Sequence, residues 1–250
     1  MHKRRGAAYP IIVREEGGER LLQFGRTLQS VMRLDGSGRG ADYVDLFPLV
    51  RLFVSPLESV LFVGLGGGSA PRQFAAFDPA LRIEVVEIDP AVVAVAREFF
   101  AFEEGANLEV HVGDGAAWVR DTAREYSAIV IDAYTAVRRR LVVPPELETA
   151  AFFRDCRARL GADGVLAFNC AARRGDRLTR RIAGALRSVF PSVVGIESRD
   201  GRNVVLFASA ARLESNPRAL RELARARLAA GQLPSARIAA GVLRVLPQPE

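Results

Sequence analysis

Apolar residues change their spacing near residue 59, and this change divides the chain into two parts. Before it, IIVREEGGERLLQF predicts two short strands joined at Gly17–Gly18, a glycine pair typical of hairpin turns. TLQSVMRL predicts a third strand, and YVDLFPLVRLFV is apolar at helical spacing until Ser55–Pro56 ends it. We therefore expect a small β-stranded region followed by a helix.

From residue 59 onward, predicted strands and helices alternate. Continuous apolar runs such as SVLFVG and SAIVIDAY predict strands that are buried on both faces of a sheet. PAVVAVAREFF predicts a helix with Pro90 in its first turn, and LETAAFFRDCRARL predicts a helix closed by Gly161. SVVGIES and RNVVLFASA predict a final antiparallel hairpin that turns at Asp200–Gly201.

This alternation predicts an α/β fold in which helices cover both faces of a mostly parallel sheet. A final antiparallel hairpin is typical of the seven-stranded, Rossmann-like methyltransferase fold. We expect an N-terminal β-hairpin region over residues 1–40, a nucleoside-binding domain over 41–212 and a helical tail over 213–250.

Composition suggests the setting of this fold. With 49% apolar residues, the 250-residue chain can bury a full core. Its two cysteines, Cys156 and Cys170, lie in predicted elements, which favours a reducing compartment over a disulfide scaffold. No apolar run approaches the roughly 20 residues of a membrane span, and MHKRRGAAYPIIV is a poor signal peptide. We expect a cytoplasmic protein without a membrane partner.

The net charge of +6 comes from arginines that are scattered along the chain. Because no basic run is interleaved with exposed aromatic residues, we do not expect a nucleic-acid partner. With only two histidines, a metal site is not expected either.

Four glycines follow the first parallel strand: Gly64, Gly66, Gly67 and Gly68. A glycine turn between a strand and a helix lets a ligand approach the main chain closely. Ser69 stands where a dinucleotide-binding motif would have its last glycine. The alternative is a tight turn without a ligand.

Acidic residues end the next two predicted strands. Glu87 can accept hydrogen bonds from ribose hydroxyls, and Ile88 beside it can cover an adenine. Asp114 and Gly115 stand where a carboxylate and a bare backbone can meet the adenine amino group. Asp114 alternatively caps the next helix. The combination favours an adenosyl ligand.

The fourth parallel strand ends in IVIDAYT, which carries Asp132 and Tyr134. Both would point into the crevice at the carboxyl ends of the strands. Asp132 can hold a ligand amine or act as a base, and Tyr134 can shape an acceptor pocket. The alternative for Asp132 is a strand-end carboxylate bonded to nearby backbone amides.

Together these residues resemble the spermidine synthase (polyamine aminopropyltransferase) family over about residues 20–210. The segments that carry the resemblance are LLQFGRTLQS, VLFVGLGGGS, VVEIDPAVVAVAREFF, VHVGDG, IVIDAY and VPPELETAAFFRDCRARLGADGVLAFN. The resemblance implies a commonly dimeric enzyme with an N-terminal β-stranded domain. It implies that Gln29, the glycine turn, Glu87, Asp114 and Gly115 hold S-adenosylmethionine or its decarboxylated form. Tyr43 and Asp45 match the first and third residues of the family's Tyr-His-Glu or Tyr-Gln-Glu, next to the substrate.

The chain departs from the family pattern at acidic positions. Gly67 stands where the family has an aspartate that helps to hold the aminopropyl group, and Thr135 replaces an aspartate that acts on the attacking amine. The triplet Arg138–Arg140 is expected to lie either on a basic rim that repels polyamines or on a solvated loop.

Three hypotheses follow. The first is a spermidine-synthase-like transferase that moves an aminopropyl group to a small-molecule acceptor, with Asp132 and Asp45 doing the work of the missing acids. The second is a small-molecule methyltransferase on the same scaffold. The third is a protein that binds an adenosyl ligand without turnover.

Overall fold

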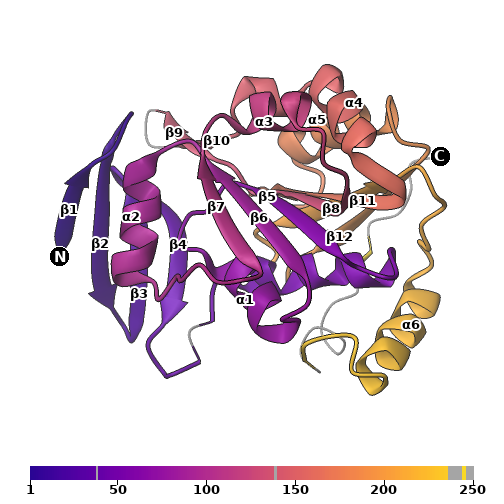
Figure 1. Cartoon of the computed structure of the whole chain (residues 1–250), viewed down its shortest axis with the longest axis horizontal. Helices are drawn as coiled ribbons and strands as arrows, with labels where there is room; N and C mark the ends of the chain where they lie inside the picture. Colours follow the sequence, from indigo (N-terminus) through magenta and orange to yellow (C-terminus); the bar gives the residue numbers. More distant parts are fainter. Residues whose placement is uncertain (38, 138–139, 236–243, 246–250) are drawn as a thin grey trace.

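Four antiparallel strands form an N-terminal sheet in the order β1-β2-β3-β4 (Figure 1). The computed structural model describes residues 1–37, 39–137, 140–235 and 244–245. The strands are β1 (His2–Arg5), β2 (Pro10–Glu16), β3 (Glu19–Phe24) and β4 (Thr27–Arg33). Gly17 and Gly18 join β2 to β3 with φ of 60° and 77°, as the predicted hairpin requires. The sequence did not predict β1, which pairs with β2.

A 3-10 helix, η1 (Asp42–Leu52), follows where apolar spacing predicted a helix. Pro48 lies inside it and has no N–H group to donate to an earlier carbonyl, which disfavours a regular α-helix. Its buried Leu46, Phe47 and Leu49 pack against the central sheet.

The central sheet has the strand order β14-β12-β13-β11-β8-β5-β6-β7. Its strands are β5 (Ser59–Val63), β6 (Arg82–Glu87), β7 (Leu108–Val112), β8 (Tyr126–Ile131), β11 (Leu160–Cys170), β12 (Ser192–Glu197), β13 (Val204–Ser209) and β14 (Arg244–Val245). β5, β6, β7, β8 and β11 pair in parallel, whereas β13 lies antiparallel between β11 and β12. The predicted Rossmann-like fold with its final hairpin is therefore confirmed, and the short β14 extends it.

Helices cover both faces of this sheet (Figure 1). The helices are α1 (Ser69–Phe77), α2 (Pro90–Phe99), α3 (Gly115–Asp121), η2 (Pro145–Glu148), α4 (Ala150–Arg159), α5 (Arg177–Arg187) and α6 (Pro217–Ala229). One core joins the sheet to η1, α1 and α6, and the other joins it to α3, α4 and α5. Val92 and Val95 of α2 pack against Ile11 and Leu22 of the N-terminal sheet, which fixes that sheet beside the central one.

One local expectation needs correction. The helix α4 ends at Arg159 and the chain enters β11 directly, so Gly161 lies in a strand and does not close the helix. Arg140, the described residue of the arginine triplet, begins β10 (Arg140–Val142), which pairs antiparallel with β9 (Thr135–Val137). Arg138 and Arg139 lie outside the described residues.

Within the described part of the chain, no helix is both long and apolar enough to cross a membrane. Both cysteines are buried as free thiols.

Candidate functional site

A cavity of about 670 Å³ lies at the carboxyl ends of the parallel strands, between them and the N-terminal sheet. This volume is typical of small-molecule sites. The last residue of β6 and the segments that follow β5, β7 and β8 contribute to its wall, with Glu87, Gly64, Asp114 and Asp132. Gln29 of β4 lines it from the opposite side, and the Gln29 Nε2 atom is buried without a partner among the described residues.

The glycine turn begins at the end of β5, beside the end of β8. Gly64 has a φ of 96°, and a Cβ atom there would lie 2.4 Å from the carbonyl oxygen of Asp132. Only glycine fits this position without a shift of the backbone. Gly64 and Gly66 line the large cavity, whereas Gly67 and Gly68 are not part of its described wall.

Glu87 ties the end of β6 to this turn. Its Oε2 atom accepts a hydrogen bond from Leu65 N at 2.9 Å, and its Oε1 atom accepts one from Asp89 N at 3.0 Å. Burial raises the pKa of the Glu87 carboxyl, and these backbone bonds oppose the shift. The carboxylate is thus held rigidly at the cavity wall.

The segment after β7 presents a second carboxylate. Asp114 caps α3, because its Oδ1 atom accepts a hydrogen bond from Ala117 N at 2.8 Å. Gly115 follows it, and both line the cavity. Ile88 also lines the cavity, and its side chain is 65% exposed.

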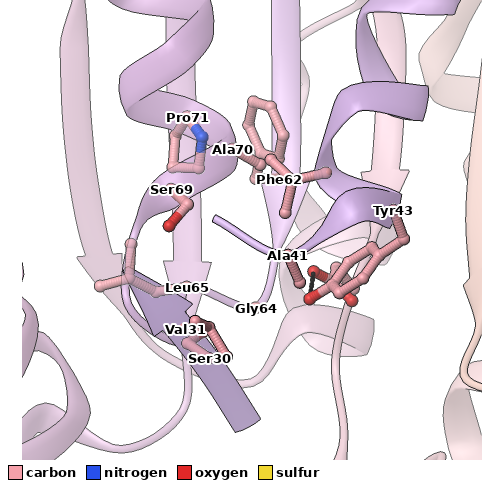
Figure 2. Close-up of a pocket in the computed structure, with 12 residues that line it drawn as sticks. Ser30, Val31, Ala41, Tyr43, Phe62, Gly64, Leu65, Ser69, Ala70 and Pro71 are labelled. Atoms are coloured by element: carbon pink, nitrogen blue, oxygen red, sulfur yellow. Dashed lines mark hydrogen bonds between the residues drawn. The ribbon is translucent and has the colours of Figure 1, made fainter. Parts of the chain in front are cut away.

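Both carboxylate oxygens of Asp132 accept hydrogen bonds from side chains. Tyr43 Oη donates to its Oδ2 atom at 3.2 Å (the dashed line in Figure 2), and Asn169 Nδ2 donates to its Oδ1 atom at 2.8 Å. Asn203 Nδ2 holds Asn169 Oδ1 at 3.0 Å. Burial raises the pKa of Asp132, while the bonds from Asn169 and Tyr43 partly offset the shift. The sequence did not single out Asn169 or Asn203.

We predict that Tyr43→Phe raises the pKa of Asp132 further. The Tyr43 hydroxyl stabilises the ionised carboxylate, and its loss favours the protonated form. A ¹³C NMR titration of the aspartate carboxyls measures the change. Tyr126→Phe is the matched control, because the Tyr126 hydroxyl bonds to Glu84, which does not line the large cavity. An unchanged pKa of Asp132 in Tyr43→Phe would contradict the prediction.

Tyr134 also lines the cavity, but its hydroxyl is engaged by the main chain. It donates to Asn169 O at 2.6 Å and accepts from Ala171 N at 2.7 Å. Burial raises the pKa of Tyr134 well above its ordinary value. These bonds tie the segment after β8 to the end of β11.

Asp45 does not lie at the cavity, contrary to the sequence-based expectation. Its Oδ1 atom accepts a hydrogen bond from Gln73 Nε2 of α1 at 3.3 Å. With three residues per turn in a 3-10 helix, positions 43 and 45 point in different directions. Tyr43 faces the cavity, so Asp45 faces α1.

Gly67 packs against β4 and the end of α2. Its N–H donates to Ser30 Oγ at 3.0 Å, and a Cβ atom there would lie 3.0 Å from Phe100 Cδ1 and 3.1 Å from Ser30 Cβ. Figure 2 shows Ser30 beside the turn that contains Gly64 and Leu65. An aspartate at position 67 would therefore need its neighbours to move.

The charges of the cavity wall are mainly negative. The charged residues of its described wall are Glu87, Asp89, Asp114, Asp132, Glu146, Asp200 and Arg202. The hairpin β9–β10 contributes Leu141 to the wall, whereas Arg140 is exposed and is not part of it. For the described part of the triplet, this exposure favours the solvated alternative. In the same residues, no cluster of three or more His, Cys, Asp or Glu side chains is arranged to hold a metal ion.

Comparisons with known proteins place the chain in a family. Residues 46–173 match the spermine/spermidine synthase domain. The polyamine aminopropyltransferase of Neisseria meningitidis serogroup A is 32% identical over 201 residues, which cover 78% of this chain and 74% of that protein.

Two solved structures share the fold. A probable spermidine synthase from Corynebacterium glutamicum superposes with a TM-score of 0.75 at 19% identity, covering 89% of this chain and 86% of that chain. Human methyltransferase-like protein 13 in complex with SAH superposes with a TM-score of 0.67 at 25% identity, covering 78% of this chain and 95% of that chain. From the matched domain and the Neisseria relative, we conclude that the chain belongs to the spermine/spermidine synthase family.

Proposed function

We propose that the protein is a transferase that moves the aminopropyl group of decarboxylated S-adenosylmethionine to an amine acceptor. The observation that carries this proposal is Asp132, a carboxylate with a raised pKa that Tyr43 and Asn169 hold in a mainly acidic cavity. Both substrates are cationic, and buried cations require acidic partners. Membership of the family supports the same reaction.

The donor would lie along the wall formed by the ends of β5, β6 and β7. Glu87 would accept hydrogen bonds from the ribose, while Asp114 and the Gly115 backbone would hold the adenine under Ile88. The unpartnered Gln29 Nε2 atom would find an acceptor on the ligand, because buried donors are rarely left unpaired. Gly64 and Gly66 line the cavity, so the donor would lie against the main chain of the glycine turn.

Asp132 would act at the other end of the donor. The lone pair of the acceptor nitrogen attacks the methylene carbon beside the sulfonium, and the C–S bond breaks. Its electron pair stays on sulfur, which gives 5′-methylthioadenosine. The nitrogen loses a proton, and Asp132 in its ionised form accepts it. Tyr43 would position this carboxylate, and Tyr134 would shape the acceptor end.

The test is to incubate the purified protein with decarboxylated S-adenosylmethionine and putrescine. We expect 5′-methylthioadenosine and spermidine in equal amounts, measured by liquid chromatography with mass detection. Product no greater than in an enzyme-free blank would contradict aminopropyl transfer to putrescine. Tight donor binding without product across a panel of amines would favour the non-catalytic hypothesis.

Methyl transfer is the second candidate function. The human neighbour holds SAH, the product that methyl transfer leaves, and that ligand carries a carboxylate. Arg202 supplies a cation to the cavity wall that can pair with such a group. The released product separates the two reactions, because methyl transfer yields S-adenosylhomocysteine. Calorimetry provides a second criterion, since a clear preference for decarboxylated S-adenosylmethionine would exclude this candidate.

We further propose that two copies form a homodimer in the cytoplasm, with no nucleic-acid partner. The outer edges of β1 and β4 end the N-terminal sheet, and a second copy would cover such an edge. Sedimentation of the purified chain measures its oligomeric state.

A further inference from the structure

The segment between β1 and β2 lies along the large cavity. Ala7, Ala8 and Tyr9 all contribute to the wall. The sequence predicts only a basic stretch followed by a hairpin here. In the structure, it brings side chains from the start of the chain to the site at the ends of the parallel strands.

The first end of this segment is fixed beside the proposed donor site. Ala7 N donates to Asp89 Oδ2 at 2.7 Å, while Asp89 Oδ1 caps α2 through Ala91 N at 2.9 Å. Asp89 lies two residues after Glu87, so the segment passes next to the carboxylate that would hold the ribose. Both oxygens of Asp89 are thus used to hold protein main chain.

The other end is fixed at the acceptor side of the cavity. The Tyr9 hydroxyl is hydrogen-bonded to Thr135 Oγ1, at the start of β9. The Tyr9 ring stacks on Phe24 of β3 with the centroids 5.0 Å apart, which holds the hydroxyl in place. The hairpin β9–β10 lies beside the N-terminal sheet in Figure 1. Two walls that are distant in sequence therefore meet through two hydroxyl groups.

The Tyr9–Thr135 pair is uncharged, and this sets it apart from the acidic groups of the same wall. A protonated amine is not a nucleophile, and a carboxylate stabilises that protonated form. The oxygen of a hydroxyl group can accept hydrogen bonds from the N–H bonds of a neutral amine, which leaves the nitrogen lone pair free to attack. Both Tyr9 and Thr135 are only half-buried, so an acceptor can reach them.

We propose that Tyr9 and Thr135 together bind the acceptor nitrogen as a neutral amine, which makes the N-terminal segment part of the acceptor site. This inference rests on the proposed function, because it assumes that the cavity binds an amine next to an adenosyl donor. Tyr9 then contributes to the choice of acceptor, and the donor site does not depend on its hydroxyl.

The test measures binding of putrescine to the complex of the protein with 5′-methylthioadenosine. Calorimetry on wild type, Tyr9→Phe and Thr135→Val gives the two dissociation constants separately. We expect each variant to weaken putrescine binding about fivefold to tenfold, as the loss of one hydrogen bond implies, with 5′-methylthioadenosine binding unchanged. Thr135→Ser retains the hydroxyl and is expected to restore wild-type binding.

Thr27→Val is the matched control, since Thr27 Oγ1 has no partner in the described structure and the residue is not part of the cavity wall. The double variant Tyr9→Phe/Thr135→Val should be no weaker than either single variant, because one pair is removed in all three. Equal weakening of 5′-methylthioadenosine and putrescine would overturn the inference, since Tyr9 would then only support the wall. Failure of wild type to bind 5′-methylthioadenosine would contradict the proposed function, and the inference would fall with it.

Discussion

Replacing Asp132 with asparagine is expected to lower the rate of transfer by at least about a hundredfold, the usual scale for the loss of a catalytic base. Asparagine has nearly the same shape, but it cannot accept the proton of the attacking amine or balance a cation. The asparagine side chain has only one oxygen, so either Tyr43 Oη or Asn169 Nδ2 would lose its hydrogen-bond acceptor. The measurement is the initial rate of 5′-methylthioadenosine release at saturating donor.

Asp163→Asn is the control for this substitution. Asp163 is an exposed residue of β11 and does not line the large cavity, so the same chemical change should leave the rate unaltered. Circular dichroism of both variants shows whether the fold is kept. A rate for Asp132→Asn within about threefold of wild type would remove Asp132 from the proposed mechanism.

The raised pKa of Asp132 also fixes the sign of the pH dependence. As a base it acts only when ionised, so transfer should decline as the pH falls through a pKa above the ordinary value of about 3.9. Stability has the opposite sign. Between the ordinary and the raised pKa, the folded chain keeps a proton that the unfolded chain has lost, so stability decreases as the pH rises. Glu87, whose pKa is also raised, contributes in the same direction.

The backbone of the site could be predicted from the sequence because local signals determine it. Buried apolar runs predict β5, β6 and β8. The acidic residues and glycines at the ends of such strands lie together, because the carboxyl ends of parallel strands share one edge of the sheet. Gly64, Glu87, Asp114 and Asp132 accordingly lie around one cavity. The position of these four residues at one edge of the sheet follows from the parallel arrangement of the strands that precede them.

The partners of these residues could not be predicted, because they come from distant segments without a local pattern. Asn169 reaches Asp132 across 37 residues, and Tyr9 reaches Thr135 across 126. A three-residue family pattern predicts Asp45 at the site, whereas in the 3-10 helix η1 its side chain accepts a hydrogen bond from Gln73. Likewise, strand alternation in β10 turns Leu141 inward, so Arg140 stays outside.

Gly64→Ala is expected to destabilise the fold by about 3 kcal/mol, the combined scale of a left-handed backbone and an overpacked contact. At a φ of 96°, any side chain is strained, and the new Cβ atom would lie 2.4 Å from a backbone oxygen that cannot rotate away. Relief requires β5 and β8 to separate where Gly64 meets Asp132. The variant should therefore also lose affinity for 5′-methylthioadenosine.

Urea unfolding measures the first effect and calorimetry the second. Gly113→Ala is the matched control, since nothing lies within 4 Å of a Cβ atom there and its φ is not positive. Destabilisation by Gly64→Ala together with unchanged affinity for 5′-methylthioadenosine would mean that donor binding does not depend on this turn.

Because the clash involves the backbone carbonyl of Asp132 itself, Gly64→Ala should also reduce the rate of transfer more than its loss of donor affinity explains. The glycine that permits the turn thus also lets the backbone of Asp132, the proposed base, lie close to the end of β5.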